Sequence, residues 1–181
     1  PENPRATEPW ECVPIYSWSE DSEMQQRGTY PAFKSINEHE GLAKADIDGD
    51  GKLDIAGGGR WFKHLEGNTF AVNIVDAGYA FSRAAAGQLI EGGRPEIVLV
   101  VGDGVAPLML YEWRKGTWSP QVILPEVDNG HSLAVLDFNG DGQLDIFNAE
   151  MRLDGGNPDA KNLILLGDGQ GNFTTLQISS G

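Results

Sequence analysis

The chain has 181 residues, of which 40% are apolar, and this is enough to bury the core of one domain. Its 13 Lys and Arg against 27 Asp and Glu give a formal net charge of −14, which disfavours nucleic acid and anionic membranes as partners. The single Cys12 excludes an internal disulfide, and no segment has the pattern of a membrane span. We therefore expect an acidic, soluble protein with a source of stability other than disulfides.

The first 27 residues differ in composition from the rest, because Pro and acidic residues recur through them. This pattern predicts an extended N-terminal arm over residues 1–27. A leading strand is expected next, over residues 28–38. The aromatic and apolar side chains expected to anchor the arm are Trp10, Ile15, Tyr16 and Trp18.

Residues 46–55 read Asp-Ile-Asp-Gly-Asp-Gly-Lys-Leu-Asp-Ile. Oxygen side chains at positions 1, 3, 5 and 9 of this loop converge on one point. Glycines at positions 4 and 6 let the backbone turn sharply and bring the carbonyl of position 7 into the same shell. A site made only of oxygens is typical of calcium. The predicted ligands are Asp46, Asp48, Asp50, the Lys52 carbonyl and Asp54.

Short strand patterns surround this loop. Alternating apolar residues over 69–75 and short apolar runs over 53–57 and 60–64 predict strands. The same order recurs twice further along the chain, and no stretch shows a capped helical period. We therefore predict an all-β fold of blades with four antiparallel strands each, over residues of about 39–78, 79–127 and 128–181.

A second copy of the loop, at residues 88–97, has lost its ligands. Gln88, Ile90 and Gly92 stand at the ligand positions, so we expect the turn to survive and no ion to bind. Glu96 stands where Asp54 stands in the first loop.

The third copy, at residues 137–146, is intact. An EF-hand needs a bidentate Glu at position 12, where this chain has Gly57 and Asn148. A pair of Asp/Gly turns without an ion is the other alternative. We predict two structural Ca²⁺ sites, the second formed by Asp137, Asn139, Asp141, the Gln143 carbonyl and Asp145.

The loops recur in steps of about 40 to 50 residues, a period typical of propeller blades or a similar stacked β array. Together with the run Leu-Leu-Gly-Asp-Gly-Gln-Gly-Asn-Phe173, they resemble the FG-GAP/VCBS repeats of integrin α-chain propellers and of many secreted bacterial proteins. The resemblance spans residues 28–181. It implies part of a seven-bladed, calcium-stabilised β-propeller in a secreted, extracellular or periplasmic protein.

A narrower similarity is to the propellers of aldos-2-ulose dehydratases and of polysaccharide lyases. The segments that carry it are Arg83-Ala-Ala-Ala-Gly-Gln-Leu-Ile, Asn-Gly-His131-Ser-Leu and Ala-Glu150-Met-Arg.

Three blades do not close a ring, and an open arc leaves faces and strand edges exposed. We therefore expect a fragment, a product from which a C-terminal part was removed, or a protomer whose missing blades come from another chain.

Polar residues at the start of each innermost strand are the candidates for chemistry, because these positions line the central channel of a propeller. Glu40, Ser82 and His131 each lie six residues before the first loop position, with His39 and Arg83 beside them. In an enzyme, Arg83 would neutralise an enolate-like charge while His131, His39 or Glu40 moves the proton. In the alternative, the histidines only hydrogen-bond to neighbouring blades.

Two functions therefore stay open. The first is a carbohydrate-active enzyme of the lyase or dehydratase type, and the second is a non-catalytic, calcium-dependent propeller that binds carbohydrate or an extracellular protein. Trp61, Trp113 and Trp118 are spaced with the blade period, so we expect them in the core between blades rather than stacked on sugar.

Overall fold

The computed structural model describes residues 12–16, 40–151 and 159–178. Within these residues the strands form three separate antiparallel sheets, each with four strands. There is no α-helix in this described part, and one short 3₁₀ turn precedes the second sheet. The all-β prediction and the prediction of four-stranded blades are confirmed.

Each sheet uses consecutive strands of the chain. The first blade consists of β1 (Ala43–Ala45), β2 (Asp54–Gly57), β3 (Arg60–Glu66) and β4 (Thr69–Ile74). The second blade follows the 3₁₀ turn η4 (Ala77–Tyr79) and consists of β5 (Ser82–Gly87), β6 (Glu96–Val101), β7 (Val105–Arg114) and β8 (Thr117–Asp128). The third blade consists of β9 (Gly130–Leu136), β10 (Asp145–Glu150), β11 (Asn162–Gly167) and β12 (Phe173–Ile178).

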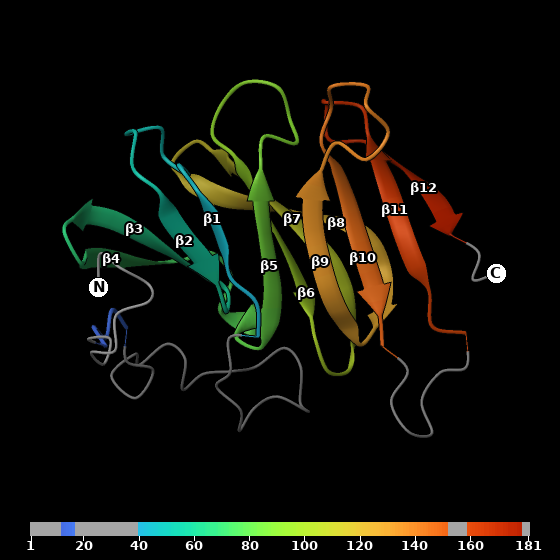
Figure 1. The fold of residues 1–181 in the computed structure, drawn as a ribbon, viewed down its shortest axis with the longest axis horizontal. Coiled ribbons are helices and arrows are strands. Elements are labelled where there is room, and N and C mark those ends of the chain that lie inside the picture. The colour runs from blue at the N-terminus through green and yellow to red at the C-terminus, as the bar shows by residue number, and fades with distance from the viewer. Residues whose placement is uncertain (1–11, 17–39, 152–158, 179–181) are drawn as a thin grey trace, which may run out of the picture.

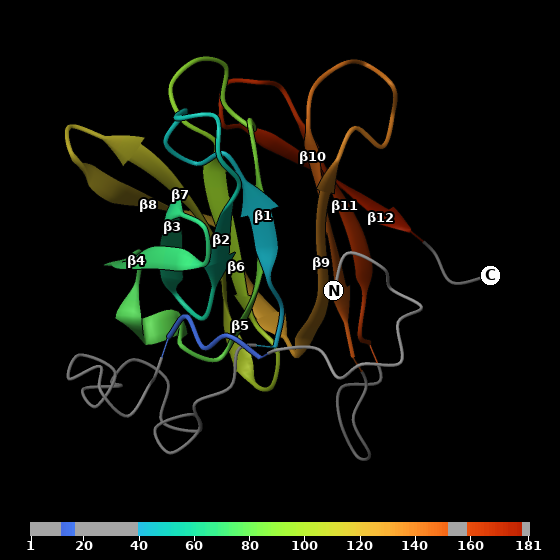
Figure 2. The same cartoon turned by 60° about the vertical axis from the view of Figure 1, so that its left-hand side comes forward.

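The first strand of each blade lies innermost, with β5 in contact with both β1 and β9. Figures 1 and 2 show the three sheets fanning outward from these strands, so that β4, β8 and β12 form the outer edges. The β1–β2, β5–β6 and β9–β10 loops lie together along one edge of the arc, at the top of Figure 1. The starts of β1, β5 and β9 lie at the opposite edge, so the predicted metal loops and the predicted rim residues are at opposite ends of the blades.

Apolar side chains fill both spaces between blades. Between the first and second blades, the rings of Trp61, Trp113 and Trp118 meet edge to face with centroids 5.2 to 6.3 Å apart. Arg94 lies over two of these rings, 4.7 Å from the centroid of Trp113. The prediction that these tryptophans belong to the inter-blade core is confirmed.

Both outer faces of the arc carry exposed apolar side chains. On the first blade, the ring of Tyr16 contacts that of Phe62 at 5.4 Å, and Phe62 is buried, while Val72 and Ile74 on the same face are 42 and 39% exposed. The third blade exposes Leu136, Phe138 and Leu176, with exposed fractions of 57, 40 and 51%. Tyr16 thus has the anchoring contact predicted for the arm, whereas the predicted anchors Trp10 and Trp18 and the predicted strand over 28–38 lie outside the described residues.

Candidate metal loops and inter-blade rim

The two intact loops have the backbone that their glycines predict. Gly49 and Gly51 have φ angles of 76° and 86°, and Gly140 and Gly142 have φ angles of 80° and 90°. Glycine adopts such positive φ angles at little energetic cost. Each loop can therefore turn sharply at its fourth and sixth positions.

The first carboxylate of each loop closes the turn. Asp46 accepts the backbone N–H groups of Asp50 and Gly51 at 3.0 and 2.8 Å. Asp137 accepts those of Gly140 and Gly142 at 2.7 and 3.0 Å. The loops are thus preorganised by their own hydrogen bonds before any ion enters.

The first loop gathers a set of hard oxygens that fits a divalent cation. One carboxylate oxygen each from Asp46, Asp48 and Asp50 lie within 4.8 Å of one another. The side chain of Asp48 is only 9% exposed, and its buried Oδ1 has no hydrogen-bond partner among the described residues. An unpaired buried carboxylate oxygen is costly, and a cation in the loop would satisfy it.

The second loop presents two carboxylates and one amide. Asn139 donates from Nδ2 to Asp141 at 2.8 Å, and Asp141 also accepts the backbone N–H of Gln143 at 2.8 Å. These two hydrogen bonds, the backbone one first, lower the pKa of the Asp141 carboxyl below its ordinary value. Both hydrogen bonds therefore favour the charged form of the Asp141 carboxylate, the form that a cation site requires. Binding by the Lys52 and Gln143 carbonyls remains a prediction.

The ninth position of the loop also has a structural role, which the loop pattern does not predict. Asp54 is fully buried. Its oxygens accept the N–H groups of Ile47 at 3.2 Å, of His64 at 2.7 Å and of the Trp61 indole at 3.0 Å. This carboxylate therefore joins the loop to β3, in addition to any contact with an ion.

Asp145 does the same in the third blade. It is fully buried and accepts the backbone N–H groups of Phe138 at 2.8 Å and Gly167 at 2.9 Å. A hydrogen bond across seven residues, from the second loop position to the ninth, is common to both blades. The acidic residue at position 9 could be found from the sequence, but its backbone partners could not.

The eroded loop uses the same anchor without a ligand set. Glu96 accepts the N–H groups of Leu89 and Ile90 at 2.8 and 3.0 Å. Gln88 replaces the first aspartate, and its amide donates to the carbonyls of Ile90 and Gly92 at 2.5 and 2.8 Å. An amide donor here stabilises the turn internally.

Glu96 makes a prediction about pH possible. Burial is the largest cause that raises the pKa of its carboxyl, from 4.5 to about 7. The unfolded chain releases this proton at lower pH than the folded chain, so the contribution of Glu96 to stability falls as the pH rises from about 4.5 to about 7. Between pH 4.5 and about 7 we expect the free energy of unfolding of the unsubstituted chain to fall by an amount on the order of 1 to 3 kcal/mol because of Glu96. In the Glu96→Gln variant this decrease should be absent.

The measurement is the free energy of unfolding from urea titrations at several pH values. Glu126 lies exposed on β8, so Glu126→Gln serves as a control with the same chemical change. Equal pH profiles for the Glu96→Gln variant and the unsubstituted chain would contradict the prediction.

At the opposite edge of the arc, the structure brings three of the predicted rim residues together. Arg83 on β5 lies between the other two, with its Nη2 3.4 Å from Oε2 of Glu40 and 3.2 Å from Nδ1 of His131. Its Nη1 also donates to the Glu40 carbonyl. Side chains from all three blades therefore meet at one guanidinium.

The environment of His131 defines its tautomer. A guanidinium only donates hydrogen bonds, so Nδ1 of His131 accepts from Arg83. Nε2 then carries the proton and donates it to Oδ1 of Asp103 at 2.7 Å. Both ring nitrogens are engaged, and the side chain is 19% exposed.

The remaining rim predictions have different outcomes. His39 lies outside the described residues. Ser82 is fully buried, and its hydroxyl has no hydrogen-bond partner in the part of the chain that the structure describes. Asp103 was not predicted; it lies in the turn between β6 and β7, and only the fold brings this turn to His131.

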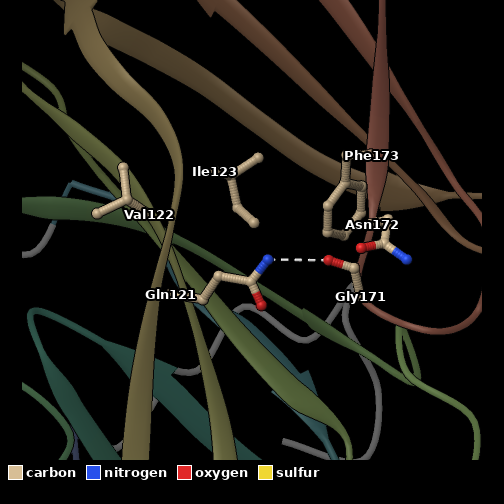
Figure 3. Close-up of a pocket in the computed structure, with 6 residues that line it drawn as sticks. All are labelled: Gln121, Val122, Ile123, Gly171, Asn172 and Phe173. Atoms are coloured by element: carbon tan, nitrogen blue, oxygen red, sulfur yellow. Dashed lines mark hydrogen bonds between the residues drawn. The ribbon is translucent and has the colours of Figure 1, made fainter.

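A separate surface hollow of about 250 Å³ lies where β8 meets the start of β12 (Figure 3). Gln121 spans it and donates to the carbonyl of Gly171 at 2.9 Å. No charged side chain lines it, so it has less to offer a polar ligand than the rim. Its lining residues are Gln121, Val122, Ile123, Gly171, Asn172 and Phe173.

A comparison with protein-family models matches residues 93–147 to an FG-GAP-like repeat. The chain contains an FG-GAP-like repeat. The matched segment begins in the eroded loop and ends just past the second intact loop, so the repeat unit runs from one loop to the next and includes β6 to β9. The predicted FG-GAP/VCBS resemblance is thereby confirmed for residues 93–147.

Searches of curated proteins and of solved structures gave no match to the chain. The narrower similarity to sugar dehydratases and lyases therefore remains a prediction. Among the described residues, no helix is long and apolar enough to cross a membrane.

Proposed function

We propose that the chain is a calcium-stabilised segment of an extracellular β-propeller that binds carbohydrate or another protein and does not catalyse a reaction. The FG-GAP-like repeat supports the propeller architecture, and such repeats are typical of extracellular proteins. The two intact loops would hold the calcium, each at the same edge of its blade.

The engagement of His131 carries the non-catalytic part of this proposal. A general base needs a free lone pair that can reach the substrate proton, and the lone pair of His131 is directed at Arg83. The charge of Arg83 is in turn paired with Glu40. These groups connect three blades, and both ring nitrogens of His131, the candidate base, are engaged in this arrangement. Nε of Arg83 and Oε2 of Glu40 have no hydrogen-bond partner among the described residues.

Calcium would have a structural role. The carboxylates of each loop repel one another without a cation, while the backbone anchors at Asp54 and Asp145 connect each loop to the sheet. An ion would therefore stabilise the edge of the blade that carries the loop. The rim lies at the other edge, away from this ion.

The exposed apolar face of the third blade is a candidate surface for contact with a partner. Leu136, Phe138 and Leu176 are 40 to 57% exposed there, whereas the two inner spaces between blades are closed by apolar side chains. We propose that this face packs against a further blade, which is supplied by another chain or by a C-terminal continuation of the propeller.

Replacement of His131 by Ala tests the proposed role of the rim. We expect a loss of about 1 to 3 kcal/mol in the free energy of unfolding, because Arg83 and Asp103 lose a partner in a partly buried site. His64 provides a matched control. Its ring stacks on Phe70 at 4.8 Å within the first blade, so His64→Ala leaves the inter-blade contacts intact and is expected to cost less.

The same variant decides between the two functions. The unsubstituted chain is incubated with uronate-containing and neutral polysaccharides, with calcium or with EDTA, and is assayed for retention by the polysaccharide and for unsaturated products. Calcium-dependent retention without product supports the binding module. Turnover that His131→Ala abolishes at an unchanged melting temperature would contradict it.

An enzyme of the lyase or dehydratase type is the second candidate, and one observation favours it. An arginine, a histidine and two acids gather at the predicted rim, which is the set that proton abstraction next to a carbonyl requires. In that case a substrate carboxylate would displace Glu40 from Arg83. If the guanidinium moved toward that carboxylate, it would also release Nδ1 of His131, which could then accept the proton.

A further inference from the structure

The first calcium loop contains a cation of its own. Nζ of Lys63, on β3, contacts Oδ2 of Asp48 and lies 3.1 Å from Oδ2 of Asp50. The side chain of Lys63 is 28% exposed, so its ammonium is held against the loop and is partly shielded from water. Lys52, within the loop, donates instead to the carbonyl of Leu65 at 2.5 Å.

Among the described residues, no cationic side chain contacts the second loop, and the strand register shows why. Phe62 on β3 pairs with Ile55, and Leu165 on β11 pairs with Ile146. The next residue toward the loop is Lys63 in the first blade and Leu166 in the third. The two loops thus share a sequence pattern but differ in charge at the same structural position.

We infer that Lys63 is an internal counter-ion that calcium must displace, so that the first loop binds calcium more weakly than the second. The inference rests on the proposed function, because it concerns the same calcium loops. An ammonium and a Ca²⁺ ion repel each other at contact distances, and the oxygens that the ammonium occupies are predicted ligands. Asp48 Oδ1, which is buried and without a hydrogen-bond partner among the described residues, is the oxygen left for the entering ion.

The consequence is that the two loops fill in order. At low calcium the second loop is occupied and Lys63 stabilises the first. At higher calcium Lys63 moves to solvent, which its partial exposure permits, and the first loop fills. The stability of the chain then responds to calcium in two steps.

Calorimetric calcium titration tests the inference on the intact chain in the Asp141→Ala background, which disables the second loop. We expect Lys63→Met to tighten the remaining calcium site about ten-fold or more and Lys63→Arg to bind like the parent. Lys44→Met is the matched control. It removes the same charge from the same blade, and the Lys44 side chain is exposed on β1.

The melting temperature in EDTA is a second measurement, and it does not depend on calcium binding. Lys63→Met is expected to lower the melting temperature more than Lys44→Met does, because the carboxylates of the first loop lose their counter-ion. Equal calcium affinities for Lys63→Met and Lys44→Met would overturn the inference and leave the calcium proposal intact. If no variant binds calcium, both the inference and the calcium proposal fail.

Discussion

Asp54→Ala and Asp145→Ala are each expected to lower the free energy of unfolding by about 2 to 4 kcal/mol, in EDTA as well as in calcium. Both carboxylates are fully buried, and their removal leaves backbone N–H groups such as those of His64 and Gly167 without an acceptor. The loss therefore does not depend on an ion. Urea denaturation followed by fluorescence and circular dichroism measures it.

Asp50→Ala is the control for the first of these variants. It removes a carboxylate from the same loop, but the Asp50 side chain is 30% exposed, and within the described part of the chain it accepts one backbone N–H, that of Lys52. We expect it to cost less than about 1 kcal/mol in EDTA. If Asp54→Ala and Asp50→Ala cost the same in EDTA, the ninth position acts only through the metal and the anchoring role is wrong.

Chelation of calcium is expected to produce the second large effect. A ligand that binds only the folded state at a hundred times its dissociation constant stabilises it by about 2.7 kcal/mol per site. For two filled loops we expect EDTA to lower the melting temperature by roughly 10 to 20 °C. Scanning calorimetry with calcium, with EDTA, and with EDTA followed by excess calcium measures the shift and its reversibility.

Variants that disable one loop at a time should separate the contributions of the two loops to the effect of EDTA on the melting temperature. Asp50→Ala and Asp141→Ala each remove a predicted ligand from one loop, so each is expected to lose part of the stabilisation by calcium and to keep the rest. Metal analysis of the purified chain should find calcium and not zinc, because no sulfur or imidazole ligand is present in either loop. A melting curve that is indifferent to both EDTA and calcium would contradict the calcium sites.

The sequence alone determined the local features. The apolar alternation and the turns predict strands, and the recurrence of the loop predicts where each blade begins. β8 ends at Asp128, and the second blade was predicted to end at about residue 127. These features are predictable because backbone conformation and hydrogen bonding in a turn such as Gly49 to Gly51 depend mainly on neighbouring residues.

Interactions between segments required the tertiary structure. Asp103, Arg83 and His131 are far apart in the chain, and only the packing of β5 between β1 and β9 brings the groups of all three blades to one point. The same holds for Lys63, which reaches the first loop through the pairing of β2 with β3. A sequence pattern records which groups are present, but their partners depend on register and on the distance between strands. For this reason the candidate ligands and the rim residues Glu40, Arg83 and His131 could be identified from the sequence, whereas the hydrogen bonds of the rim, the contribution of Asp103 and the internal counter-ion could not.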